Sequence, residues 1–174
     1  ITSGAATFNN FTGGITLSQP NNVFGNIALS SDTGTVNIRE NDAITQASAW
    51  NLSTYFPAVT LTTSNDQAIT LDNASNRFGN LTITQIANGN LTPGAVSIRE
   101  NDTITQGSAW TTHGATSLNS GAYSIALTNA NNVLGPLQVT GATANGYNIT
   151  IWAKETAGKA AIYDAGAAGA WSTG

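Results

Sequence analysis

The chain has 174 residues, of which five are basic and nine are acidic, so its formal net charge is −4. Charged residues make up 8 % of the chain, about a third of the usual share of roughly 25 %. So few dispersed cations exclude a nucleic-acid-binding stripe, and the evenly spread hydrophobic residues, 40 % of the chain, exclude a disordered acidic tail. No apolar run is long enough to span a bilayer, and the lack of cysteine excludes disulfides, thiol nucleophiles and cysteine-ligated zinc.

Short strands are expected along most of the chain, because apolar-polar-apolar triplets recur between turn-forming Asn, Gly, Asp and Ser residues. The triplets are, in chain order, 15–17, 27–29, 36–38, 59–61, 69–71, 81–83, 96–98, 125–127, 137–139 and 149–151. We expect no helix of ordinary length, since the Ala-rich residues 160–170 are interrupted by Gly166 and Gly169. The sequence therefore predicts an all-β protein.

An internal repeat is the strongest signal in the sequence. Residues 38–50 read IRENDAITQASAW and residues 98–110 read IRENDTITQGSAW, so the two phrases agree at 11 of 13 positions and start 60 residues apart. Two markers extend the pattern. The first is a Trp that closes each segment, at Trp50, Trp110 and Trp171. The second is an apolar residue before Gly, at Phe24, Phe78 and Leu134. We interpret the chain as three units of about 58 residues, spanning about 1–50, 51–110 and 111–171.

Two architectures produce many short strands at this spacing, a β-sandwich and a β-solenoid. We favour the solenoid, because a 58-residue unit is small for an independent sandwich, whereas a solenoid unit needs only to stack on its neighbour. Equivalent positions are then expected to lie above one another, with the three Phe or Leu markers in one stack and the three Trp markers in another. Turn and ladder positions are predicted at Asn22, Asn76, Asn132, Gly25, Gly79 and Gly135.

The cycle of ITLDNASNRFGNLTIT, VSIRENDTITQGSAW and SIALTNANNVLGPLQVTG resembles the tandem β-strand repeats of large bacterial exoproteins of the filamentous haemagglutinin and autotransporter-adhesin type. The resemblance covers about residues 15–151, and residues 154–169 depart from it because they lack the Arg-Glu-Asn-Asp phrase. It implies a parallel, right-handed β-helix, secretion to the bacterial cell surface, and a role as a stalk, fibre or adhesin. The expected partners are adjacent repeats or copies of the chain stacked end to end, and a surface glycan or host receptor.

The repeated Arg-Glu-Asn-Asp phrase is the best candidate for catalysis. It supplies Arg39, Glu40 and Asp42, and again Arg99, Glu100 and Asp102. Paired carboxylates of this kind serve polysaccharide-degrading enzymes as acid and base. We favour a solvated strand end or a turn, because alternation puts Glu40 and Asp42 on one side and Arg39 on the other. An active site is also normally unique, whereas this phrase occurs twice, so we expect no enzymatic activity.

Three further ligand hypotheses remain open. The Trp residues are predicted to pack inside the repeat, and the alternative is a sugar-stacking ladder of a carbohydrate-binding module. The Asp residues that lie among Asn and Gly are predicted to form turns, and the alternative is that their carboxylates bind calcium. These residues are Asp32, Asp42, Asp66, Asp72 and Asp102. His113 is predicted to be a plain loop residue, and no cofactor is expected.

Overall fold

The computed structural model describes residues 4–10, 12–52, 58–89, 92–140, 147–154 and 162–164, and these residues form strands and loops without a helix. This part of the chain accordingly contains no helix of the length and apolarity needed to cross a membrane. The strands are β1 (Ala6–Asn10), β2 (Ile15–Leu17), β3 (Asn26–Ser31), β4 (Val36–Glu40), β5 (Ile44–Gln46), β6 (Ala58–Thr63), β7 (Ile69–Leu71), β8 (Asn80–Gln85), β9 (Val96–Arg99), β10 (Ile104–Gln106), β11 (Thr116–Asn119), β12 (Ile125–Leu127), β13 (Leu137–Thr140), β14 (Ile149–Ile151) and β15 (Ile162–Asp164).

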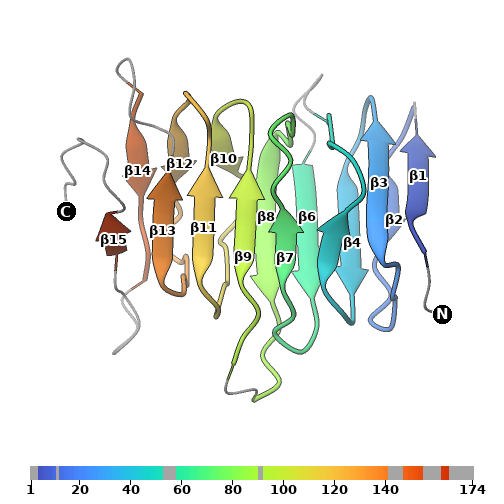
Figure 1. Cartoon of the computed structure of the whole chain (residues 1–174), viewed down its shortest axis with the longest axis horizontal. Helices are drawn as coiled ribbons and strands as arrows, with labels where there is room; N and C mark the ends of the chain where they lie inside the picture. Colours follow the sequence, from blue (N-terminus) through green and yellow to red (C-terminus); the bar gives the residue numbers. More distant parts are fainter. Residues whose placement is uncertain are drawn as a thin grey trace.

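The described strands form two parallel sheets, one of eight odd-numbered strands and one of seven even-numbered strands (Figure 1). The chain passes from one sheet to the other at every corner, so two strands complete one turn of about 22 residues. In Figure 1 the near strands run upward and the far strands downward, while the chain advances from right to left, which makes the coil right-handed. The predicted all-β, parallel β-solenoid is confirmed, with about six turns.

The predicted structural unit of 58 residues is wrong. The first Arg-Glu-Asn-Asp phrase runs from the end of β4 toward β5. The second runs from the end of β9 toward β10, five strands later. Two strands make one turn, so the sequence repeat advances two and a half turns and places β4 and β9 in different sheets. The reason is that backbone pairing between neighbouring coils sets the turn, as in Val36 opposite Val59, whatever the side chains are.

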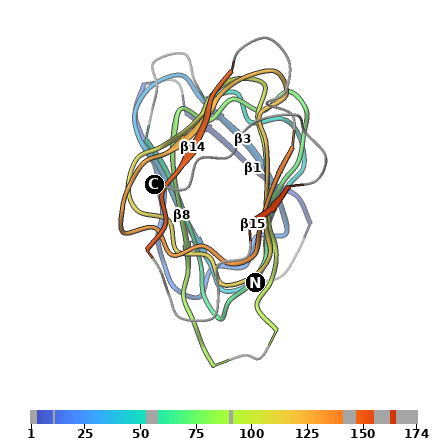
Figure 2. The same cartoon turned by 90° about the vertical axis from the view of Figure 1, so that its left-hand side faces the viewer.

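The core consists of apolar columns that run along the solenoid. Register places Val36, Val59 and Leu81 in one column of the seven-stranded sheet, and all three side chains are buried. Viewed along the axis, the coils superimpose into one elongated outline (Figure 2). Because neighbouring strands lie only about 4.8 Å apart, the same inward position in each coil must carry a side chain compatible with its own kind above and below.

Five strands were not predicted from alternation; two are β1 and β15, and the other three are β5, β10 and β11, which lie inside the sheets. Strands β5 and β10 have the sequence Ile-Thr-Gln, with one apolar residue, and β11 turns Thr116 inward in place of an aliphatic side chain. Each nevertheless pairs in parallel with a strand in the coil on either side. Their strand conformation therefore follows from the neighbouring backbones and not from their own residues.

Candidate functional site

The first coil junction joins Trp50, which follows β5, to Phe78, which precedes β8 in the next coil. Both side chains are completely buried, and their ring centroids lie 6.1 Å apart in an edge-to-face arrangement with an interplanar angle of 89°. The indole Nε1–H donates to the carbonyl oxygen of Ile27 at 3.1 Å, in the coil before Trp50. A single side chain thus links its own coil to the coil before it and the coil after it.

An asparagine holds the backbone of this junction. The Oδ1 atom of Asn76 accepts hydrogen bonds from the Trp50 N–H at 2.9 Å and from Gln46 Nε2 at 2.8 Å. Its Nδ2 atom donates to Gln46 Oε1 at 3.0 Å and to the Leu71 carbonyl at 3.2 Å. Since Asn76 is buried, these bonds satisfy an amide that would otherwise be costly to remove from water.

The second junction repeats these bonds on the opposite sheet. Asn132 Oδ1 accepts from the Trp110 N–H and from Gln106 Nε2, both at 2.8 Å. The Trp110 indole donates to the Leu81 carbonyl at 2.7 Å, on β8 of the seven-stranded sheet, whereas Trp50 donates to β3 of the eight-stranded sheet. The repeated phrase Thr-Gln-x-Ser-Ala-Trp therefore builds a contact between coils.

The structure does not assemble the predicted stacks. Trp50 and Trp110 lie against different sheets, and each contacts the Phe or Leu segment of the following coil instead of the other Trp. Asn76 and Phe78 lie between β7 and β8, at one corner of the solenoid. The equivalent residues of the other two units lie at the opposite corner, because the repeat advances two and a half turns; they are Asn22, Phe24, Asn132 and Leu134. Trp171 lies outside the described residues.

The predicted turn glycines are used in two ways. Gly25 and Gly79 have φ angles of 72° and 76°, in the left-handed region that side chains rarely adopt. Gly135 is required by close approach, because a Cβ atom there would collide with the carbonyl oxygen of Gly114 in the preceding coil.

The glutamates of the repeated phrase are buried, so the predicted solvated strand end is wrong. Glu40 is 0 % exposed and Glu100 is 1 % exposed, because the inward alternation of Val36 and Ile38 continues to Glu40. Each accepts a backbone N–H at its corner, from Phe24 at 3.1 Å and from Phe78 at 2.6 Å respectively. Buried carboxyls of this kind cannot meet a polysaccharide, which argues against the acid and base roles considered for them.

Burial shifts the titration of both glutamates. Desolvation raises the pKa of Glu100 to about 9, against a partial lowering by the Phe78 N–H. Desolvation, with a further contribution from Asp42, raises the pKa of Glu40 to about 8. One oxygen of each glutamate is buried without a hydrogen-bond partner, which fits a protonated carboxyl better than a carboxylate.

The remaining polar candidates are dispersed. Asp102 pairs with Arg77 at 3.2 Å, one coil apart. Sequence reasoning missed a contact at another corner, where His113 Nδ1 lies 2.5 Å from Oδ1 of the buried Asp66. These two residues are 47 positions apart, so no local pattern links them. Among the described residues, no group of three or more His, Cys, Asp or Glu side chains is placed to hold a metal ion.

The repeat that builds these junctions is a known one. A family described as repeats of unknown function (DUF5649) matches residues 25–85 and again residues 79–140. The chain belongs to this family. No curated protein matches the chain, and no solved structure does.

The two family matches agree with the geometry of the junctions. The first runs from Gly25 to the end of β8, and the second runs from Gly79 to the end of β13, so the matches share β8. Their start points are five strands apart and fall on different sheets. The family repeat is therefore a unit of two and a half turns that contains one complete Trp junction.

Proposed function

We propose that this chain is a structural segment of a secreted bacterial surface protein, which acts as a stalk, fibre or filament subunit in adhesion. The observation that supports the proposal most directly is the use of the repeated polar residues. Gln46 and Trp50 each donate a hydrogen bond to Asn76 of the next coil, and Gln106 and Trp110 do the same to Asn132 in the second junction. Because the repeated polar side chains form hydrogen bonds between coils, they favour a role as a spacer over a role in binding or catalysis.

The parallel pairing of the coils supports the same role. From β3 to β13, every described strand pairs in parallel with a strand in the coil on either side. Coils that stack in this way can be repeated along the axis without any change in geometry. The family resemblance to haemagglutinin-type exoproteins agrees with an extended surface array.

Pulling on the whole chain by its two ends tests the structural role. We expect stepwise unravelling of single coils, each releasing about 75 Å, because about 22 residues extend by roughly 3.4 Å each. Protease treatment of intact cells that carry the natural protein is expected to cleave this segment, as an extracellular stalk requires. Extension without force steps would contradict the spacer, and protection from protease would contradict the surface location.

Adhesion requires an exposed contact, and we place it at a hollow of about 490 Å³ beside the ring of Tyr123. The hollow is also lined by Asn80, Asp102 and Thr105, and Tyr123 is 37 % exposed, with Tyr147 5.8 Å from it between ring centroids. An aromatic ring next to hydroxyl, amide and carboxyl groups suits a glycan. The buried Trp50 and Trp110 offer no such face.

Glycan-array binding by the whole chain tests this contact. Tyr123→Ala is expected to lower retention at least about tenfold, as loss of an aromatic anchor does. The control is Ile86→Ala, because Ile86 is equally exposed at another corner and its truncation should leave retention unchanged. Equal retention by both variants, or no retention by the wild-type chain, would reject the glycan contact.

A further inference from the structure

Four side chains stand in one line along a corner of the solenoid, where the chain passes from the eight-stranded to the seven-stranded sheet. They lie one in each of four successive coils, and we call them the corner row: Arg77, Asp102, Tyr123 and Tyr147. Strands β10, β12 and β14 start opposite one another, and the last three members of the row each stand two residues before one of these starts. Arg77 joins the row through its ion pair with Asp102, in which Nε and Oδ2 lie 3.2 Å apart.

The row places a cation and a pair of aromatic rings beside the same hollow. The hollow of about 490 Å³ is lined by Asp102 and Tyr123, and the Tyr147 ring lies 5.8 Å from the Tyr123 ring between centroids. Because neighbouring parallel strands are about 4.8 Å apart, the coils that carry Arg77 and Tyr123 are about 10 Å apart. A glycan that contacts both residues is therefore longer than one sugar ring.

The guanidinium of Arg77 has donors to spare. Among the described residues it makes one hydrogen bond, from Nε to Asp102, and none from Nη1 or Nη2, and the side chain is 48 % exposed. Two parallel N–H groups of this kind match the two oxygens of a carboxylate. Burial raises the pKa of the neighbouring Glu100 to about 9, so Glu100 holds its proton and adds no negative charge at neutral pH. The ion pair thus offers a carboxylate-binding fork whose own anion, Asp102, is already balanced.

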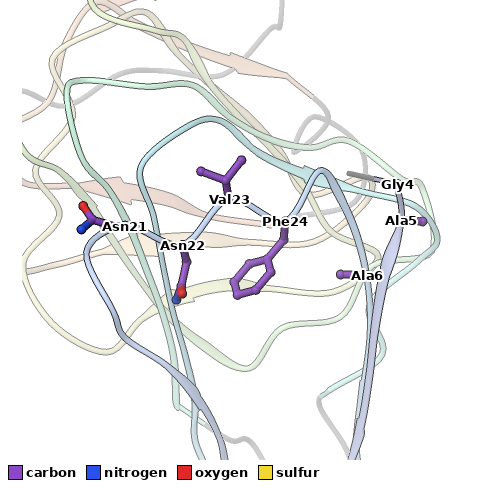
Figure 3. A pocket seen from close by; sticks show the side chains of 7 residues that line it. All are labelled: Gly4, Ala5, Ala6, Asn21, Asn22, Val23 and Phe24. Carbon is purple, nitrogen blue, oxygen red and sulfur yellow. The ribbon is translucent and has the colours of Figure 1, made fainter. Parts of the chain in front are cut away.

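Arg77 departs from the repeat. In the phrase Asn-x-Phe-Gly or Asn-x-Leu-Gly, the second position is Val23, Arg77 or Val133. Arg77 and Val133 each donate their backbone N–H to the carbonyl of a junction Trp, so the junction does not need an arginine side chain. Figure 3 shows Val23 at its own corner next to Phe24, and no charged side chain lines the hollow of about 330 Å³ there. An arginine in one copy alone is expected of a binding residue and not of a stacking residue.

We propose that the corner row binds an acidic oligosaccharide, with one sugar ring stacked on Tyr123 and the carboxylate of a neighbouring sugar held by Nη1 and Nη2 of Arg77. The inference rests on the proposed glycan contact and names the class of its ligand. Asp102 positions the guanidinium through its bond to Nε. The chemistry that the row recognises is a sugar carboxylate, which uronate chains and sialylated glycans both carry.

Isothermal titration of the whole chain with tetragalacturonate and with its methyl ester tests the charge, because the two probes differ only at the carboxyl groups. We expect at least about tenfold tighter binding of the acid, as an arginine anchor provides, and a smaller preference at high salt. Arg77→Gln breaks only a largely exposed ion pair and keeps the fold, so it should remove the preference and leave the affinity for the ester unchanged. Arg99→Gln is the matched control, since it removes the same charge from an exposed side chain outside the row.

Sialyllactose, compared with lactose, is the second arm and distinguishes the source of the carboxylate. Tighter binding of tetragalacturonate assigns the ligand to uronate chains, and tighter binding of sialyllactose assigns it to sialylated glycans. Three results would overturn the inference even if a neutral glycan of the array binds at Tyr123: equal binding of the acid and neutral forms in both arms, no binding in either arm, or a preference that survives Arg77→Gln. Absence of any glycan binding would overturn the proposed contact as well.

Discussion

Glu100→Gln is expected to make the solenoid more stable at neutral and alkaline pH. The amide is neutral at every pH, has nearly the same shape, and keeps an oxygen to accept the Phe78 N–H that Glu100 Oε1 accepts at 2.6 Å. The variant therefore removes the cost of a buried carboxyl that must either hold its proton or ionise out of water. Urea unfolding of both proteins from pH 4 to pH 9 measures the difference.

The sign of the pH dependence follows from the raised pKa values. In the unfolded chain Glu100 loses its proton near 4.5, whereas burial raises its pKa in the folded chain to about 9. The folded state thus holds more protons between these values, and its stability is greatest below the lower one and falls as pH rises, by at most about 1.4 kcal/mol per pH unit. Glu40, with a folded pKa of about 8, adds to the same trend.

The comparison with wild type carries its own check. Glu100→Gln should match wild type below about pH 4.5 and exceed it increasingly up to about pH 9, while Glu40 still contributes a residual slope. Asp72→Asn is the control, because Asp72 is exposed and its replacement removes one carboxyl while leaving the buried glutamates in place. A wild-type stability that stays constant between pH 5 and pH 8 would show that the glutamates are not buried as the structure has them.

Trp50→Ala is expected to lower the free energy of unfolding by about 3–5 kcal/mol, the usual cost of truncating a buried Trp. The indole is completely buried, packs edge to face on Phe78 and satisfies the Ile27 carbonyl. Trp152→Ala is the matched control, since Trp152 is 56 % exposed and its truncation should cost less than about 0.5 kcal/mol. Guanidinium chloride unfolding at a constant pH compares the two.

Trp110→Ala is expected to cost about as much as Trp50→Ala, and the two costs should add. The two indoles bond to different sheets, Trp50 to Ile27 and Trp110 to Leu81, and they share no partner. Residues without shared partners usually add within about 0.5 kcal/mol. A coupling of more than about 1 kcal/mol in the double variant would instead support a common Trp stack.

Much of the secondary structure was readable from the sequence because it is encoded locally. Apolar-polar-apolar triplets such as 36–38 and 81–83 form strands whose inward positions are buried. The packing role expected for Trp50 and Trp110 agrees with their complete burial. The hydrogen bonds between Asn76 and Gln46, in contrast, join residues 30 positions apart, and the equivalent bonds join Asn132 to Gln106, 26 positions apart. Because the two spacings differ, no fixed spacing in the sequence predicts this contact.

By itself, then, the sequence determined an all-β chain of short stacked strands and the phrases that recur along it. Only the tertiary structure decided how long a turn is, which phrases share a sheet, and that Glu40 and Glu100 are buried. The physical reason is that backbone hydrogen bonds between coils determine the length of a turn, and these bonds do not depend on which side chains are present. The sequence repeat spans five strands, and successive strands alternate between the two sheets. Because five is an odd number, the second copy of a phrase falls on the sheet opposite to the first.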